Sequence, residues 1–379
     1  MKNKRTNFSD QELQSKVIDF LRFPLIVGVL FIHNRTGSLV IDGQILGGSA
    51  SVMPMFYYCS QFFSQIVGGL AVPLFFFISG FLFFLNIRKF NAQNYKDKLL
   101  SRVKTLLVPY LFWNMFVLAV YFLLQSVPSL SSFSNRELDW HNFFSYFWNN
   151  SGELRAGYPI ESQADIVFPI SYQFWFIRDL MVAVLFTPLI YCMVKYLKIW
   201  CVVILGSLWL CGFWFTISPA GFNIDCIFFF TAGTYFGLNK RTLTDDFVKF
   251  KKLSFILYPI FALADLFTEE YVYNLYIHNA GIIIGIVMCF NLVALLFEKK
   301  KIKPLPFLSA ASFFVFALHE PLMKTLRKIT FLVLKPETDI ALTGLYFLNV
   351  IAVTVLTLGI YWVLRRCLPK LTAIITGGR

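Results

Sequence analysis

The sequence predicts an all-α, polytopic integral membrane protein with about ten transmembrane helices, built as a single transmembrane domain over residues 1–379. The first observation is composition: 57% of the residues are apolar, only 15% are charged, and the mean hydropathy is +0.65. The second is the aromatic content of 18%, which includes 45 phenylalanines. The third is a series of long uncharged runs, typical of helices whose backbone groups must be satisfied inside a bilayer.

Ten apolar runs are expected to form the spans, each near the length of about 20 residues that crosses a bilayer. Several are shorter, which is common where helices pack in a bundle and bend at proline or glycine. Their approximate ranges are 17–34, 66–87, 103–125, 174–194, 199–216, 224–239, 253–267, 280–297, 307–323 and 343–364.

The distribution of positive charges predicts that both termini lie in the cytoplasm. With that orientation, 25 of the 34 Lys and Arg residues fall in cytoplasmic segments, eight fall outside, and Arg22 lies within the first span. The net charge of +13 is therefore a topology signal and does not indicate nucleic acid as a partner. The first span has no small-residue cleavage site after it, so a retained helix is expected. The cations between Lys324 and Lys335 are an exception to this positive-inside rule, because they fall on the predicted outer side. Either the ninth span is misplaced or these cations belong to an outer amphipathic helix.

The remaining composition predicts no metal site. The seven cysteines contain no CxxC pair and mostly lie in apolar runs, as expected for small buried side chains without disulfides or zinc. The longest outer loop, 126–173, carries acidic and aromatic residues. These aromatics favour packing on the membrane surface, although aromatic faces also suit sugars.

The first span contains three ionisable residues, Asp19, Arg22 and His33. At 3.6 residues per turn they fall within about 60° of one another, and Arg22 and His33 are about 16 Å apart along the axis. Ionisable groups inside a membrane are costly and usually face a bundle interior or a wet cavity. The stripe predicts a polar track across the membrane; the alternative is an N-terminal anchor that ends at His33.

Two further stretches accompany this span. Pro73 and the pair Ser79–Gly80 in the second span favour close packing against the first span. Arg102 and Lys104 place two cations at the cytoplasmic mouth of the third span. They are either ordinary positive-inside anchors or a clamp for the phosphates of an anionic cofactor.

Polar residues also occur near the outer ends of later spans. Trp175 opens the fourth span and is followed by the charged pair Arg178 and Asp179, while the ninth span reaches His319 and Glu320 at a depth comparable to His33. These five residues are predicted to bind substrate. His141 and His278 are expected in outer loops and are assigned no role.

Several of these motifs together resemble the membrane acyltransferase 3 family of bacterial glycan O-acyltransferases. The resemblance spans nearly the whole chain and rests on the spacing of Arg22 and His33, the stretches 72–81 and 317–321, Arg102 with 109–110, and 175–178. It implies ten helices in a bacterial inner membrane and a cytoplasmic acyl-CoA co-substrate. It also implies that His33 and Arg22 are catalytic, that Arg22 takes part in handling acyl-CoA, and that Arg102 belongs to a basic motif. Lys104 departs from that motif, which usually has a second arginine there.

The resulting functional prediction is transfer of an acyl group, with acetyl the expected one, from acyl-CoA to a hydroxyl of a cell-envelope glycan or exopolysaccharide. His33 would act as general base or as acyl acceptor, and the residues do not choose between these roles. The expected partners are the lipid bilayer, an outer glycan acceptor and acetyl-CoA or another acyl-CoA, with an oligomer left open. The alternative is a transporter or flippase, against which stands the lack of matched halves and broken helices.

Overall fold

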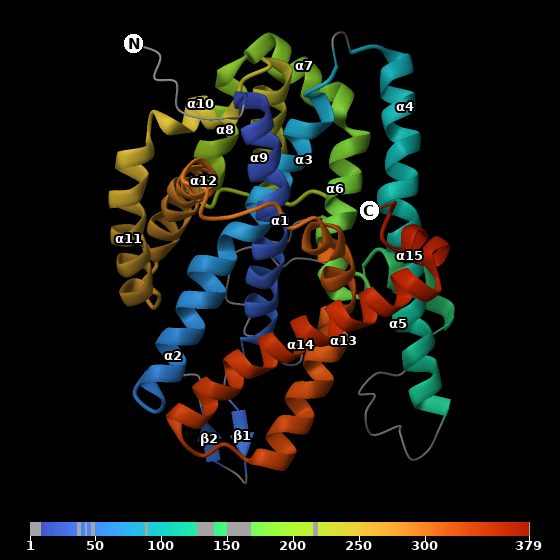
Figure 1. The fold of residues 1–379 in the computed structure, drawn as a ribbon, viewed down its shortest axis with the longest axis vertical. Helices are drawn as coiled ribbons and strands as arrows, with labels where there is room; N and C mark the ends of the chain where they lie inside the picture. The colour runs from blue at the N-terminus through green and yellow to red at the C-terminus, as the bar shows by residue number, and fades with distance from the viewer. Residues whose placement is uncertain are drawn as a thin grey trace.

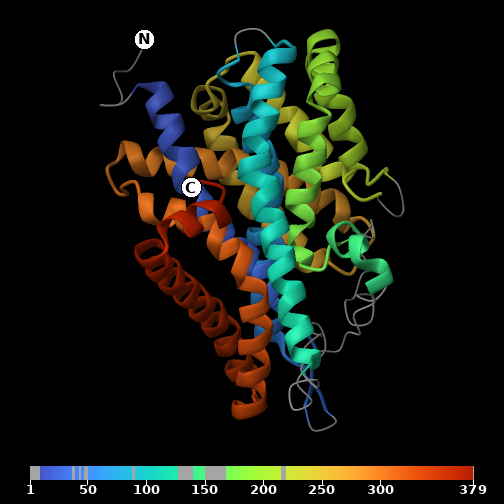
Figure 2. The ribbon, with the colours of Figure 1, turned by 90° about the vertical axis from the view of Figure 1, so that its right-hand side faces the viewer.

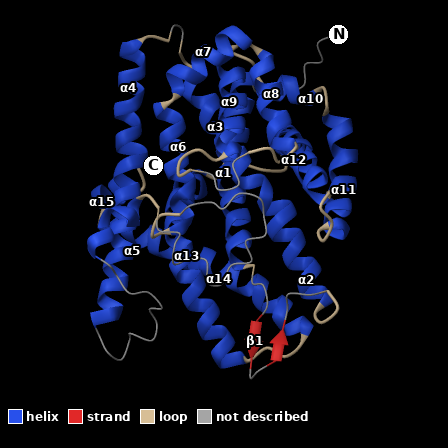
Figure 3. Cartoon of the chain, turned by 180° about the vertical axis from the view of Figure 1, so that it is seen from behind, coloured by secondary structure: helices blue, strands red, loops and turns tan. Residues whose placement is uncertain are grey.

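The computed structural model describes residues 9–35, 39–41, 44–46, 50–87, 90–126, 140–149, 168–214 and 219–378. The regular secondary structure of these residues is helical apart from one short antiparallel hairpin of β1 (Leu39–Ile41) and β2 (Gln44–Leu46), which lies at one end of the molecule (Figure 3). The all-α prediction is therefore confirmed except for this hairpin, which follows directly after the first helix.

Helix α1 (Asp10–Asn34) runs through the middle of the molecule, and the other helices surround it (Figure 1). It begins with a capping box, in which the Glu12 backbone N–H donates to the Ser9 hydroxyl and the Ser9 N–H donates to the Glu12 carboxylate. Its two ends differ in surroundings, since the N-terminal end meets α10 while the C-terminal end meets elements from four other parts of the chain.

The remaining elements follow in chain order, with three of them assigned as short π- or 3₁₀-helical turns inside longer helical runs. The bounds are α2 (Pro54–Gln61), η1 (Phe62–Val67), η2 (Gly68–Leu70), α3 (Ala71–Phe84), α4 (Ala92–Arg102), η3 (Val103–Leu107), α5 (Val108–Ser126), η5 (Trp140–Phe147), η6 (Tyr172–Phe174), α6 (Trp175–Leu185), α7 (Thr187–Leu197), α8 (Ile199–Leu210), α9 (Ile224–Leu238), α10 (Leu243–Val248), α11 (Lys251–Thr268), α12 (Asn274–Glu298), α13 (Pro306–Leu334), α14 (Asp339–Cys367) and α15 (Pro369–Ile375).

The ten predicted spans fall on helices, although 174–194 is divided between α6 and α7, and the end of 199–216 lies beyond α8 and partly outside the described residues. Five are long and apolar enough to cross a membrane, and a sixth is obtained if the runs 172–185 and 187–197, bent by 64°, form one span. The five are Pro54–Phe84, Ala92–Ser126, Asn274–Glu298, Pro306–Leu334 and Asp339–Cys367. The chain is thus a multi-pass membrane protein, while the count of ten and the cytoplasmic position of both termini stay predictions.

Close packing at Gly80 joins α3 to α9. A Cβ atom at Gly80 would collide with the carbonyl oxygen of Phe230, and one at Gly233 would collide with that of Phe77. Small residues let two helix backbones approach in this way where larger side chains would hold them apart. The prediction that Ser79–Gly80 packs on the first span is therefore wrong in its partner, because the glycine faces α9.

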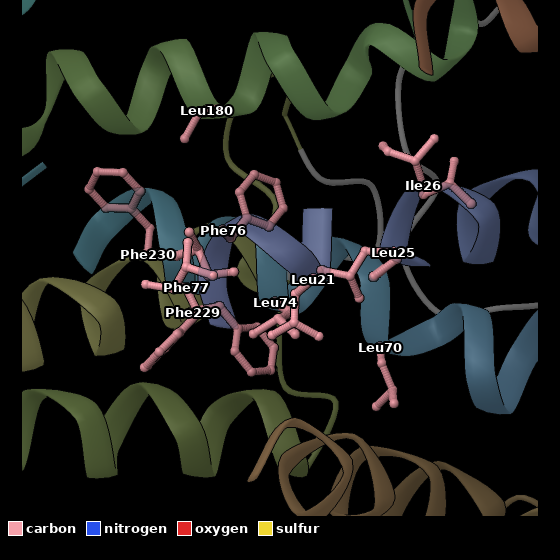
Figure 4. Packing of buried hydrophobic residues seen from close by; sticks show 14 of the residues in the cluster. Leu21, Leu25, Ile26, Leu70, Leu74, Phe76, Phe77, Leu180, Phe229 and Phe230 are labelled. Atoms are coloured by element: carbon pink, nitrogen blue, oxygen red, sulfur yellow. The ribbon is translucent and has the colours of Figure 1, made fainter. Parts of the chain in front are cut away.

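Phenylalanines from several helices fill the interior around this contact. Figure 4 shows Leu21 of α1, Phe77 of α3, Leu180 of α6 and Phe230 of α9 in one cluster, and Phe230 is fully buried. Dispersion contacts among such side chains supply much of the helix association in a membrane, where the hydrophobic effect between helices is weak.

Helix α13 continues past the predicted end of the ninth span at 323 and ends only at Leu334. The cations from Lys324 onward therefore lie on the continuation of the helix that carries His319, and they form no separate amphipathic helix. In Figure 2 the long run of α4 and α5 stands upright, while α14 crosses the molecule obliquely. The C-terminal α15 packs beside α5, where the indole N–H of Trp113 donates to the Ile375 carbonyl at 3.0 Å.

Candidate functional site

His33 lies in the last turn of α1 and meets η6 and α13 there. Its Nδ1 is hydrogen-bonded to the hydroxyl of Tyr172, and the two rings meet edge to face with centroids 4.8 Å apart. The ring of His319 lies on another side of His33, with centroids 5.0 Å apart. His33 as a whole is half-buried. The prediction that His33 and His319 share a depth is confirmed, because their rings are neighbours.

His319 is fully buried and presents an unused nitrogen. Its Nδ1 lies 2.6 Å from the Phe316 carbonyl oxygen, which can only accept, so Nδ1 carries the proton of the neutral ring. Its Nε2 is then an acceptor, and it has no hydrogen-bond partner in the described part of the chain. Buried polar atoms are normally paired, so this orphan marks a place where a ligand or a proton belongs.

The end of α1 that carries His33 is held by hydrogen bonds with η1 and α14 and by close packing on η2. The Ser64 hydroxyl donates to the Phe31 carbonyl at 2.7 Å, and the Asn34 amide donates to the Tyr346 carbonyl at 2.7 Å. A Cβ atom at Gly68 would lie only 2.8 Å from the Gly28 carbonyl oxygen, so a side chain there would push η2 away from α1. These contacts satisfy free carbonyls at the helix end and fix the direction of the His33 side chain.

Arg178 and Asp179 form a buried pair whose groups are used internally. Each side chain is 1% exposed, and two guanidinium nitrogens donate to Asp179 Oδ1 at 2.7 and 2.9 Å. Arg178 also donates to the Trp148 carbonyl at 2.7 Å, and Asp179 accepts from backbone N–H groups of Gly221 and Asn223. The pair thus ties two loops to α6, and its predicted role in substrate binding has no open surface to support it.

The predicted cations stand apart from the histidines. Arg22 is about 16 Å along α1 from His33 and pairs with Asp19 at 3.3 Å, with 37% of its own side chain exposed. Arg102 is half-buried at the end of α4, and Lys104 is exposed in the π-helical turn η3. Both lie on the run that packs on α6, so the structure does not bring them into the histidine cluster.

The sequence of the chain was compared with known proteins. A family model described as an acyltransferase domain, Acyl_transf_3, matches residues 16–366. The chain belongs to the acyltransferase 3 family. No curated protein and no solved structure matches it. Because the match covers both histidines and all the predicted cations, it assigns acyl transfer to this fold and favours an enzyme over a transporter.

Sequence reasoning missed Tyr172 of this acyltransferase. The residue lies in η6, a single 3₁₀ turn, and it is 7% exposed. The turn is fixed on both sides, since the Ser171 N–H donates to the Asn114 side chain at 3.2 Å and the Gln173 amide donates to the Ala317 carbonyl at 3.1 Å. A turn of three residues has no periodicity, so only its position just before Trp175 could have signalled it.

The other predicted residues of the acyltransferase lie near or beyond this cluster. Glu320 follows His319 and pairs with Lys324 at 2.5 Å, while Trp175 is half-buried at the start of α6 and packs on Phe76. His278 is not in a loop as expected: it lies in α12, where its Nδ1 is 2.8 Å from a carboxylate oxygen of Asp265. No three His, Cys, Asp or Glu side chains converge on a metal position among the described residues.

Proposed function

We propose that the protein transfers an acyl group, with acetyl the expected one, from cytoplasmic acyl-CoA to a hydroxyl of a cell-envelope glycan in a bacterial inner membrane. The observation that carries the proposal is the cluster of His33, His319 and Tyr172. It combines the imidazole of a half-buried residue, a hydrogen bond that orients it, and a buried second imidazole with an unused acceptor. Family membership supports acyl transfer; the donor, the acceptor and the residue roles are proposed.

The hydrogen bond to Tyr172 selects the reactive atom of His33. When Nδ1–H donates to the tyrosine oxygen, Nε2 keeps its lone pair and can take a proton. His319 Nε2 is an unprotonated acceptor beside it, so it can share the proton that His33 takes up. Tyr172 and His319 are positioning residues in this scheme, and His33 is the residue that acts on the substrate.

The transfer step balances with these groups alone. The acceptor oxygen attacks the thioester carbonyl carbon, a C–O bond forms, and the C–S bond breaks. His33 Nε2 takes the hydroxyl proton and returns it to the leaving CoA sulfur, so the products are an ester and free CoA thiol. In the alternative, Nε2 attacks the thioester first and the acyl group then passes to the hydroxyl. Both routes use the same nitrogen.

The donor is proposed to reach this nitrogen along α1. Arg102 and Lys104 would hold the CoA phosphates, and Arg22 would guide the arm that bears the thioester. The rise of about 16 Å from Arg22 to His33 is comparable to an extended pantetheine arm. The thioester would then lie at His33 while the charged end of the cofactor stays near the cytoplasm.

The test measures label transferred from acetyl-CoA, labelled in its acetyl group, to an envelope glycan fraction by protein reconstituted in vesicles. Wild type should label the glycan and release one CoA thiol per acetyl group. His33→Ala should lower the rate 10²–10⁴-fold, the usual contribution of a general base. His141→Ala is the matched control, because His141 is exposed on η5, and it should keep full activity. Movement of unmodified glycan across the vesicle would instead establish the transporter.

Tyr172→Phe isolates the orienting hydrogen bond, because it removes only one oxygen and keeps the ring contact. It should lower kcat about 2- to 10-fold, the range expected for losing one neutral hydrogen bond, and leave both KM values unchanged. A raised KM with normal kcat would instead make Tyr172 a substrate contact. Normal turnover by His33→Ala would show that His33 is not catalytic and would leave His319 as the candidate.

A further inference from the structure

The part of α13 beyond His319 presents charged side chains on the face that meets the catalytic cluster. Glu320, Lys324 and Arg327 are spaced four and three residues apart, so they share one side of the helix. The Lys324 ammonium lies 5.1 Å from the centroid of the Tyr172 ring, and the hydroxyl of Tyr172 is hydrogen-bonded to His33. Arg327 follows three residues after Lys324, about 4.5 Å further along the same side of α13.

Three carboxylates at this end of the described structure already have partners. Glu320 pairs with Lys324 at 2.5 Å, and Glu269 pairs with Arg35 at 2.7 Å and accepts from Tyr57. A third carboxylate, that of Asp339, accepts from two backbone N–H groups at the start of α2. Within the described ranges, Arg327 has no carboxylate at ion-pair distance, although its side chain is half-buried.

We propose that Arg327, one turn beyond Lys324 on α13, forms an anion subsite near His33 that selects acceptors carrying a carboxylate or phosphate near the hydroxyl to be acylated. The inference rests on the proposed function and names its substrate class. A guanidinium offers a planar set of donors that matches both anions, and one without a carboxylate partner among the described residues can bind them. Anchoring by the positive-inside rule does not account for these cations, because they lie on the predicted outer side.

The test uses competition in the labelling assay. The probes are a tetrasaccharide containing glucuronate, its carboxyl-reduced counterpart, and a glycosyl phosphate of similar size. With wild type, at least one acidic probe should inhibit glycan labelling at a concentration about tenfold below that of the neutral probe. The stronger acidic probe identifies carboxylate or phosphate as the preferred group. Added salt should reduce the preference by screening.

Arg327→Gln should abolish the preference for acidic probes, and Arg327→Lys should keep part of it because it retains charge but not the planar fork. Lys335→Gln removes one cation from the exposed end of the same helix and should keep the whole preference. Equal inhibition by all three probes overturns the subsite. A raised KM for acetyl-CoA in Arg327→Gln also overturns it, because the residue would then hold CoA phosphates. Absence of labelling by wild type is a different outcome and refutes the proposed transfer itself.

Discussion

Two arginine–aspartate pairs in this chain each lie within a predicted span, and they differ in burial and in the contacts that they make. Arg178 and Asp179 are each 1% exposed, and Arg178 donates two short hydrogen bonds to Asp179. Asp19 and Arg22 make one contact of 3.3 Å and are 53% and 37% exposed. The buried pair also binds the backbone of two loops. The exposed pair binds nothing beyond its own helix among the contacts described above.

The difference shows which pair can serve a ligand. A buried pair has already lost its hydration, and its attraction and hydrogen bonds replace that hydration only while both partners stay. Its groups therefore cannot be diverted to a substrate without cost. The Asp19–Arg22 pair makes one longer contact and leaves both side chains partly uncovered by the protein, so Arg22 can exchange Asp19 for an anionic ligand. We infer that Arg178 and Asp179 support the fold, and that Arg22 is the arginine available to acyl-CoA.

The largest effect is expected for Asp179→Ala. Removing one partner leaves the Arg178 charge buried and unpaired, which typically costs about 3–5 kcal/mol. The yield of folded protein and its unfolding temperature in detergent should both fall sharply. If Asp179→Ala instead stays fully stable and loses only transfer, the pair belongs to the substrate site, as the sequence first indicated.

Arg22→Ala should leave the stability of the protein nearly unchanged and weaken binding of the acyl donor, acetyl-CoA. The KM for acetyl-CoA should rise about tenfold with kcat little changed, as expected when a residue contributes binding and no chemistry. Initial rates over a range of acetyl-CoA concentrations measure both constants. Asp19→Ala is the control, because it removes the partner and keeps the arginine, and it should not raise KM. Equal damage by the two variants would make the ion pair itself the functional unit.

Arg102→Ala and Lys104→Ala test the proposed phosphate clamp. Each should weaken acetyl-CoA binding several-fold, and the loss should be larger at low salt, where screening is weakest. Arg102→Ala should have the larger effect, because Arg102 is half-buried and Lys104 is exposed. Equilibrium binding of labelled acetyl-CoA at two salt concentrations measures this. Unchanged affinity in the double variant would return both residues to the role of membrane anchors.

The smallest effect is expected for a third pair, Arg241 and Asp246, which lies outside the predicted spans and has intermediate exposure. Burial opposes ionisation of Asp246, but hydrogen bonds from Lys249 and Arg241 outweigh it and lower the pKa of this carboxyl below its usual value. A lowered pKa adds stability above the pKa of the unfolded chain, and this is lost as pH falls through the folded value. Asp246→Asn should lower the unfolding temperature slightly at pH 7.

The size of that effect should match about 0–1 kcal/mol, as for other ion pairs near the surface. The difference between Asp246→Asn and wild type should shrink as pH falls through the lowered folded pKa of Asp246 and disappear well below it, where the carboxylate is protonated in both states. Unfolding temperatures measured at several pH values test this. A difference that persists at low pH would show that the asparagine changes packing, and that the charge is not the cause.

Much of this protein was predictable from local pattern. Apolar runs predicted every helix that carries a proposed span, because hydropathy and helix formation depend on neighbouring residues. The spacing of Arg22 and His33 placed both on one helix face for the same reason. His33 and His319 were recognised as polar residues inside apolar segments, where such residues are costly.

The tertiary structure determines which helix faces contact one another and which side chains are buried by those contacts. It placed Tyr172, from a turn without periodicity, against His33, and it turned Gly80 toward α9 and away from α1. It buried Arg178 with Asp179 while leaving Arg22 half-exposed. Contacts between residues more than a hundred positions apart depend on how whole helices pack, and no local spacing contains that information. Residue type and helix face therefore followed from the sequence, whereas partnership and exposure, which determine whether a charged group can act on a ligand, followed from packing.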